Sequence, residues 1–188
     1  MTNAIPMQID IVSDVVCPWC IIGYKNLEDA ISRLDGEIDV KLRWHPFELN
    51  RDMPPEGQDL AEHIKEKYGL TADQSADNRA RITMMGENVG FPIHFSSDSR
   101  IYNTFDAHRL LYWAGKEGEY GQQTALKLNL FAAYFQGGDN MADHGVLKRA
   151  VEEVGLSPDR AAEILASDEF AKEVRAEEDE FGEAGISS

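Results

Sequence analysis

Cysteine is scarce in this sequence of 188 residues, which contains only Cys17 and Cys20. Long hydrophobic runs are absent as well, since no apolar stretch approaches the roughly 20 residues that a membrane-spanning helix needs. The first residues have no basic segment, and Asp10 and Asp14 interrupt their apolar stretch, so they do not resemble a secretory signal. Together with Met1, which indicates the native start, these absences predict a cytoplasmic protein without a structural disulfide.

Basic residues are few, because 18 lysines and arginines stand against 34 aspartates and glutamates, for a formal net charge of −16. Such a charge repels nucleic acids and anionic membranes, so neither is expected as a partner. The acidic run at 177–183 is typical of the solvated face of a helix. The length and the balance of hydrophobic (43%) and charged (28%) residues predict a soluble globular protein with one core, either alone or with an insertion.

The first 50 residues predict a βαβ unit. Residues 7–16 alternate and are β-branched, as in a strand, and residues 18–34 have helical periodicity. Pro18 fits the first turn of that helix, where a missing backbone N–H costs nothing. A second strand is predicted at 38–49, so the cysteines lie between the first strand and the helix.

After residue 50 the pattern becomes helical. Helices are predicted at 59–69, 72–90, 101–118, 120–136, 143–154, 158–167 and 168–184. Thr71 with Gln74, and Ser157 before Pro158, have the spacing of helix caps. Two strands form too small a sheet for a domain, and no further strand is predicted before Ser188.

The spacing of the two cysteines has three explanations: a redox dithiol, half of a metal site, or coincidence. Two cysteines placed at random would be three apart roughly 1 time in 100. A metal site needs at least two more ligands, and the histidines show no paired spacing. The histidines are His45, His63, His94, His108 and His144. A redox dithiol is therefore favoured, because a C-x-x-C beside a βαβ pattern is typical of thioredoxin-like proteins.

The helix start assigns a role to each cysteine. A helix N-terminus carries partial positive charge and free N–H groups, which stabilise a thiolate. We expect Cys17, at the exposed junction of strand and helix, to have a depressed pKa and to attack. Cys20, one turn further and shielded, is expected to resolve the mixed disulfide.

Four segments give the sequence a family resemblance. They are SDVVCPWCIIG, RWHPFELN, MPPEGQDLAEHIKEKYG and RIYNTFDAHRLLYWA. In this order they resemble the FrnE-like branch of the DsbA family, which is cytoplasmic and related to 2-hydroxychromene-2-carboxylate isomerases and kappa-class glutathione transferases. The resemblance covers nearly the whole chain. It implies an α/β, thioredoxin-like fold with a large all-helical insertion: residues 1–50 and 168–188 form the thioredoxin-like domain and residues 51–167 the insertion.

The resemblance also implies site residues. Thiol–disulfide oxidoreductase activity would reside in the C-P-x-C motif of Cys17, Pro18, Trp19 and Cys20. The helix beginning near 101 would lie over the dithiol and bring its residues to the substrate.

Residues outside the motif have two interpretations each. The resemblance makes Asn103 and His108 candidates to contact a substrate or glutathione, whereas spacing alone makes Asn103 a helix cap. His45 could support a thiolate or move a proton, but a hydrogen-bonded structural histidine is the favoured interpretation. A further set is expected in the core: Met84, Met85, Phe131, Tyr134 and Phe135.

Two departures from the family pattern stand out. The family has a valine and a cis-proline facing the cysteines soon after A-G-I, then two strands and a helix, and we expect the natural chain to continue past Ser188 with these elements. Thioredoxin-like enzymes often have a buried acid six residues before the first cysteine, where this sequence has Ile11. The nearest acid, Asp14, is interpreted as facing solvent.

Three functions compete. The favoured one is an intracellular thiol–disulfide oxidoreductase acting on a protein or small-molecule thiol or disulfide. The alternatives are a glutathione-dependent isomerase or transferase, in which Cys20 would have no task, and a binding module with a vestigial dithiol. No bound cofactor or metal is expected; glutathione is a candidate co-substrate, and an open sheet edge could support a homodimer.

Overall fold

The computed structural model describes residues 4–187, so the ends of the predicted thioredoxin-like segments, 1–3 and 188, lie outside the described residues. The strands are β1 (Ile5–Ser13), β2 (Ile38–Pro46), β3 (Gln58–Asp59) and β4 (Arg100–Ile101). The α-helices are α1 (Pro18–Arg33), α2 (Leu60–Tyr68), α3 (Ala72–Asn88), α4 (Phe105–Glu117), α5 (Gln122–Ala132), α6 (His144–Glu153), α7 (Pro158–Leu165) and α8 (Ala171–Glu183). A π-helical turn, η1 (Ala133–Gly137), continues α5.

The predicted βαβ unit is confirmed. Strands β1 and β2 pair in parallel, in a register that runs from Ile5 opposite Ile38 to Ser13 opposite Pro46, and α1 connects them. Strand β1 ends three residues earlier than predicted. Asp14 and the next two residues form a turn, in which the Cys17 amide donates to the Asp14 carbonyl at 3.4 Å.

The predicted helices are present, with one correction. Residues 100 and 101 do not begin a helix but form β4, which pairs antiparallel with β3. The Tyr134 hydroxyl donates to the Arg100 carbonyl at 2.8 Å, and α4 begins only at Phe105. The predicted capping box of Thr71 and Gln74 at the start of α3 is confirmed, because each side chain bonds the other residue's backbone.

Three buried hydrophobic clusters hold these elements together, and the smallest joins Leu60 of α2 to Ile101 of β4 through Met53. The first joins the turn after β1 to α4, α5, α6 and α7, and the second joins α1 and β2 to α3, α5 and η1. Phe131 and Phe135 are buried in the second cluster and Tyr134 packs against it, as expected. Met84 is not in the core: it is 54% exposed, because it lies on the outer face of α3, whereas Met85 packs against the cluster.

The two edges of the β1–β2 sheet differ. The outer edge of β2 is capped by side chains: the backbone of Trp44 exchanges two hydrogen bonds with the Gln123 amide (3.0 and 2.9 Å), and Tyr120 donates to the Val40 carbonyl. The other edge of β1 has no strand beside it within residues 4–187. Dimerisation through that edge stays a prediction.

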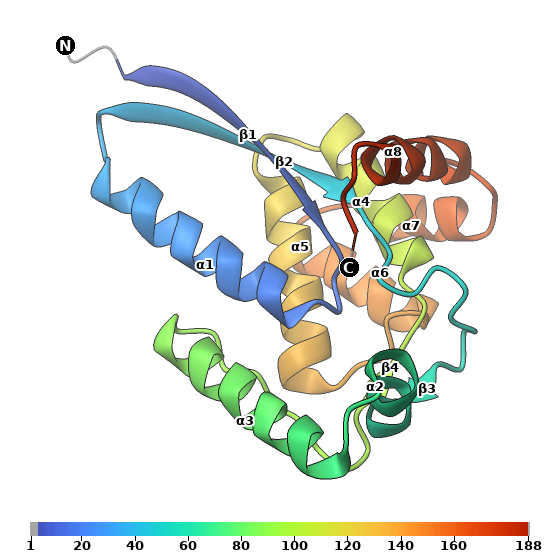
Figure 1. Ribbon diagram of the computed structural model, residues 1–188. Coiled ribbons are helices and arrows are strands. Elements are labelled where there is room, and N and C mark those ends of the chain that lie inside the picture. The colour runs from blue at the N-terminus through green and yellow to red at the C-terminus, as the bar shows by residue number, and fades with distance from the viewer. Residues whose placement is uncertain (1–3, 188) are drawn as a thin grey trace.

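Helix α8 brings the end of the described chain back to the sheet. In Figure 1 it lies beside the end of β2, and the C-terminal residues run toward the end of β1. In residues 4–187 no helix is long and apolar enough to cross a membrane. The fold class is thus α/β with mostly helical content, while the division into a thioredoxin-like domain and an insertion stays a prediction, as do the cytoplasmic location and the continuation past Ser188.

Candidate functional site: a dithiol at the start of a helix

The dithiol lies where the chain passes from β1 into α1. Cys17 is the N-cap residue of α1, in an extended conformation, and Pro18 occupies the first turn. The Cys20 amide donates to the Cys17 carbonyl at 3.2 Å, which closes that turn. Both cysteines are free thiols and both are half-buried. The exposure that was predicted to distinguish Cys17 from Cys20 is therefore not observed.

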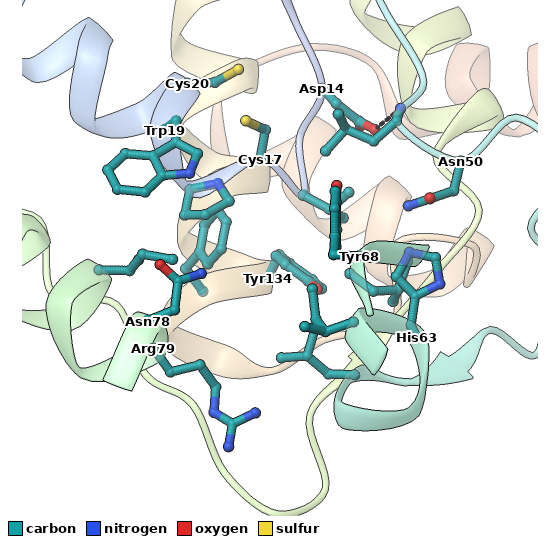
Figure 2. A pocket seen from close by; sticks show the side chains of 18 of the residues that line it. Asp14, Cys17, Trp19, Cys20, Asn50, His63, Tyr68, Asn78, Arg79 and Tyr134 are labelled. Carbon is teal, nitrogen blue, oxygen red and sulfur yellow. Dashed lines mark hydrogen bonds between the residues drawn. The ribbon is translucent and has the colours of Figure 1, made fainter. Parts of the chain in front are cut away.

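A cavity of about 450 Å³ opens beside the two sulfurs. Figure 2 shows the sulfurs of Cys17 and Cys20 next to each other at one end, with Trp19 on the same side and His63 and Tyr68 of α2 across the space. Most of the lining is apolar, and it comes from β1 and the turn after it, the segment after β2, α2, α3, β4, η1 and the residues after α8. The apolar lining residues are Val12, Val16, Phe47, Leu49, Leu60, Ile64, Leu70, Ile82, Phe95, Ile101, Phe135 and Ile186.

Trp19 and the polar residues of α3 form one side of this cavity. Trp19 is 42% exposed, and the Arg81 guanidinium lies 5.5 Å from the centre of its ring. Asn78 and Arg79 line the cavity from α3, and Arg79 donates to the Ser75 hydroxyl at 3.1 Å. This side can thus bind polar groups of a ligand while the rest of the lining contacts its apolar part.

The two thiols titrate as a pair. The Cys17 thiol hydrogen-bonds to the Cys20 sulfur, and this bond, with further support from the Ser13 hydroxyl and the charge of Lys127, lowers the pKa of Cys20 to about 6. The same hydrogen bond, together with burial and the neighbouring negative charge, raises the pKa of Cys17. One proton therefore leaves the pair easily and the other is held. We expected the depressed pKa at Cys17; in this arrangement the Cys17–Cys20 hydrogen bond lowers the pKa of Cys20 instead, and which of the two sulfurs attacks stays a prediction.

Asp14 is buried, at 1% exposure, and does not face solvent as the sequence suggested. Its carboxylate accepts a 2.8 Å hydrogen bond from the Leu49 amide and lies 3.3 Å from Nε2 of His108. Burial opposes its ionisation, but the hydrogen bonds from His108 and Leu49 and the charge of Lys127 lower the pKa of Asp14. A buried carboxylate is therefore present at the dithiol, at a different position from the one that Ile11 occupies.

The candidate substrate contacts on α4 lie elsewhere. His108 is buried and faces Asp14, and it does not line the cavity. Asn103 accepts from the Phe105 amide at 2.9 Å and donates to the Met53 carbonyl at 3.0 Å, so its side chain links the start of α4 to the segment after β2. It is not the helix cap that its spacing indicated, because the N-cap residue of α4 is Thr104. Neither Asn103 nor His108 lines the cavity, because α2 and α3 cover this side of the dithiol rather than the start of α4.

His45 is a structural histidine. Its Nδ1 lies 2.9 Å from Glu177 of α8 and its Nε2 lies 2.8 Å from Asp10 of β1, and its ring packs on Phe181 at 4.8 Å between centroids. Although burial opposes the charged form, the two carboxylates raise the pKa of His45. The residue ties α8 to the sheet and does not contact the dithiol.

Sequence reasoning missed Lys127. It lies on α5 between the apolar residues Leu126 and Leu130 and is completely buried. A lysine on the apolar face of a predicted helix was the available signal. Within residues 4–187, no group of three or more histidine, cysteine or acidic side chains is arranged to hold a metal ion.

The fold and the site together define a class. A C-x-x-C motif at the junction of a strand and a helix in a parallel βαβ unit, followed by a large helical region, is the arrangement of a thioredoxin-like protein with a helical insertion. The sequence matches the family of the DSBA-like thioredoxin domain over residues 8–187. The chain therefore belongs to this family, and the membership that its motifs implied is confirmed.

Individual proteins resemble the chain over most of its length. The protein YwbO of Bacillus subtilis (strain 168) is 30% identical over 150 residues, which is 80% of this chain and 67% of YwbO. A solved structure from Streptomyces coelicolor, described as a "probable DsbA oxidoreductase", has a TM-score of 0.88 at 26% identity and covers 97% of this chain and 77% of its own. The cytosolic disulfide reductase DsbM of Pseudomonas aeruginosa, solved with glutathione, shares the fold with a TM-score of 0.60 at 16% identity over 95% of this chain and 81% of DsbM.

Proposed function

We propose that this protein exchanges disulfides with thiol or disulfide substrates through the Cys17–Cys20 dithiol. The observation that carries the proposal is the pair of adjacent sulfurs at the start of α1, one of which has a pKa near 6, at the end of a cavity. A thiol with this pKa is largely a thiolate at neutral pH, and the thiolate is the species that attacks disulfides. Membership in a family that includes oxidoreductases supports the same activity.

The reaction needs no further oxidant beyond the substrate. A hydrogen-bonded thiol–thiolate pair can move its single proton between the sulfurs, and the Cys20 amide favours a thiolate on Cys17. The Cys17 thiolate attacks one sulfur of a substrate disulfide, so that its S–S bond breaks and the other sulfur leaves as a thiolate that takes up a proton. Cys20 then gives up its proton and attacks the Cys17 sulfur, which releases the second substrate thiol and leaves the Cys17–Cys20 disulfide. Two electrons have passed to the substrate, and the reverse sequence oxidises a substrate dithiol.

Glutathione is the low-molecular-weight thiol that we propose as co-substrate. The cavity beside the sulfurs has about 450 Å³, room for a molecule of that size, and its Asn78 and Arg79 can bind polar groups. DsbM, which shares the fold, was solved with glutathione. The alternative activity, glutathione-dependent isomerisation, uses the same co-substrate but needs no resolving thiol.

Two single substitutions test the proposal. Cys17→Ser should abolish disulfide exchange, because it removes the attacking sulfur. Cys20→Ser should leave the attack intact and trap a mixed disulfide with glutathione, detectable by mass spectrometry of the intact protein. The chain has no other cysteine, so each variant has one thiol and the trapped adduct is unambiguous.

The same variants separate the competing functions. Full turnover of a glutathione-dependent isomerisation substrate by Cys20→Ser would replace this proposal with the isomerase alternative. Unchanged disulfide exchange by Cys17→Ser would reject the assigned role of Cys17, and a reduced wild-type protein that forms no reversible intramolecular disulfide with oxidised glutathione would reject dithiol exchange altogether.

A further inference from the structure

We propose that Lys127 is a positioning residue for the dithiol. Its buried positive charge faces both cysteines and sets the balance between the thiolate and disulfide states. The inference rests on the proposed disulfide exchange and adds to it the residue that adjusts its equilibrium. Lys127 lies 107 residues after Cys20 in the sequence and on a different element, α5.

The environment of Lys127 fixes its ammonium group in place. The side chain has no exposed surface, and its Nζ donates to the Ser13 carbonyl at 3.0 Å. The rings of Trp44 and Phe131 lie 5.4 and 5.1 Å from Nζ, distances at which an aromatic face attracts a cation. An isolated charge in such a place costs free energy, so a charged lysine here needs a negative group nearby.

The negative groups that face Lys127 belong to β1 and α1. They are the Asp14 carboxylate and the sulfurs of Cys20 and Cys17, each of which favours the charged ammonium. Burial nevertheless lowers the pKa of Lys127 to about 8. Asp14 is itself engaged with His108 and Leu49, so the cysteine thiolate is the partner whose charge depends on the redox state.

Ser13 connects the lysine to the dithiol. It ends β1 and lines the cavity beside both cysteines: its carbonyl accepts the hydrogen bond of Lys127, and its hydroxyl donates to the carbonyl of Asp14 at 3.4 Å. The positive charge is thus held at a fixed place relative to Cys20 by the backbone of a strand rather than by a flexible side chain.

Oxidation removes this partner. When a substrate disulfide takes two electrons from the dithiol, the Cys17–Cys20 bond forms, the thiolate charge disappears and the proton of the second thiol is released. Lys127 then faces only the Asp14 carboxylate among these groups. Because the ammonium stabilises the thiolate form and has less to interact with in the disulfide form, it favours the reduced protein and makes the dithiol a stronger oxidant.

Lys127→Met tests the proposal, because methionine has a similar length and suits the apolar surroundings. We expect the thiolate absorbance of the reduced variant to titrate about one pH unit higher than in the wild type. The equilibrium constant with the glutathione couple should shift about tenfold toward the disulfide, about 30 mV toward more negative potential. Lys172→Met, on the exposed surface of α8, is the control with the same change in net charge and should leave both values unaltered. Values for Lys127→Met that match those of Lys172→Met would overturn the proposal.

A second measurement uses the unaltered protein and so does not depend on folding of a variant. In protein with isotope-labelled lysine side chains, NMR titration should give Lys127 a lower pKa in the disulfide state than in the dithiol state. Equal pKa values in the two states would reject the inference. Failure of this inference is distinguishable from failure of the proposed function. A wild-type protein that forms no reversible disulfide rejects disulfide exchange. The thiolate titration of Lys127→Met still reports, in that case, whether the lysine acts on the cysteines.

Discussion

Two buried groups of charges flank the segment that follows β2, and they are built differently. The dithiol-side cluster consists of Asp14, His108 and Lys127, and it contacts this segment through the Leu49 amide. The α8-side cluster consists of Glu48, Glu178 and Arg175, and it contains the neighbouring residue of the same segment. Adjacent positions of one short segment thus connect the turn after β1, α4 and α5 on one side with α8 on the other.

The dithiol-side cluster has matched charges. One buried carboxylate faces one buried ammonium and accepts hydrogen bonds from a histidine and a backbone amide. Such a cluster can keep its charges at neutral pH, because each has a partner. It therefore places a carboxylate and an ammonium of opposite charge beside the cysteines.

The α8-side cluster has two carboxylates for one guanidinium. Arg175 hydrogen-bonds to both Glu48 and Glu178, but the oxygens Glu48 Oε1 and Glu178 Oε1 are buried with no hydrogen-bond partner among residues 4–187. Burial and the charge of Glu178 raise the pKa of Glu48 to about 7, against the pull of Arg175. The comparison indicates that the matched charges of the dithiol-side cluster act on the reactive thiols. The unmatched carboxylates of the α8-side cluster instead make the stability of the folded protein depend on pH.

The largest effect is expected from Asp14→Ala. The substitution leaves His108 and the Leu49 amide without the buried carboxylate that they contact and removes a negative charge that favours the Lys127 ammonium. Removing one member of a buried charge pair costs about 3–5 kcal/mol. Urea denaturation should show this loss, while Asp52→Ala, on the exposed surface, should change little. A loss below about 1 kcal/mol would mean that the dithiol-side cluster is not a matched pair.

Arg175→Met should cost less, about 2 kcal/mol at pH 8, because the guanidinium is partly exposed while the two carboxylates it serves are buried. The loss should shrink at pH 5, where Glu48 is protonated and one negative charge disappears. Equal losses at the two pH values would show that the carboxylates do not repel each other in the folded protein.

Glu48→Gln should flatten the pH dependence of stability. The folded pKa of Glu48 is raised from 4.5 to about 7, so the folded state binds more protons than the unfolded state between these values. The contribution of this extra proton to the stability of the folded state is complete below about pH 4.5 and is lost as the pH rises through 7. The variant should be about 1–3 kcal/mol more stable than the wild type at pH 8, measured by urea denaturation, and similar at pH 4.5. A wild-type stability that rises from pH 5 to pH 8 as steeply as in the variant would contradict this.

Thr71→Ala should give the smallest effect and serves as the reference for a local change. It removes the capping box of α3, worth about 1 kcal/mol, and touches neither cluster. The thermal midpoint should fall while the thiolate titration stays the same. A shift of that titration would indicate that α3, which lines the cavity, influences the dithiol after all.

Local pattern was sufficient for most of the secondary structure. The alternation before Cys17, the proline after it and the caps at Thr71 and Ser157 depend on neighbours within a few residues, and each has its predicted role. The short pairing of β3 with β4 was missed, because its two strands lie more than 40 residues apart and have only two residues each.

The site was only partly predictable for the same reason. The cysteines and their place at a helix start follow from the motif, but the burial of Asp14 depends on His108 and Leu49, and the exposure of Met84 depends on which face of α3 packs on α1. The resemblance placed Asn103 at the substrate, whereas the packing of α2 and α3 decides what lines the cavity.

The sequence by itself determined the class of fold and the position of the reactive thiols, because hydrophobic period, proline and cysteine spacing act along the chain. Only the tertiary structure decided how the two thiols divide their proton, since the groups responsible come from three elements: Ser13 from β1, Cys17 from the start of α1 and Lys127 from α5. Electrostatic interactions depend on distance and burial rather than on sequence separation, and both are set only when the helices have packed against the sheet.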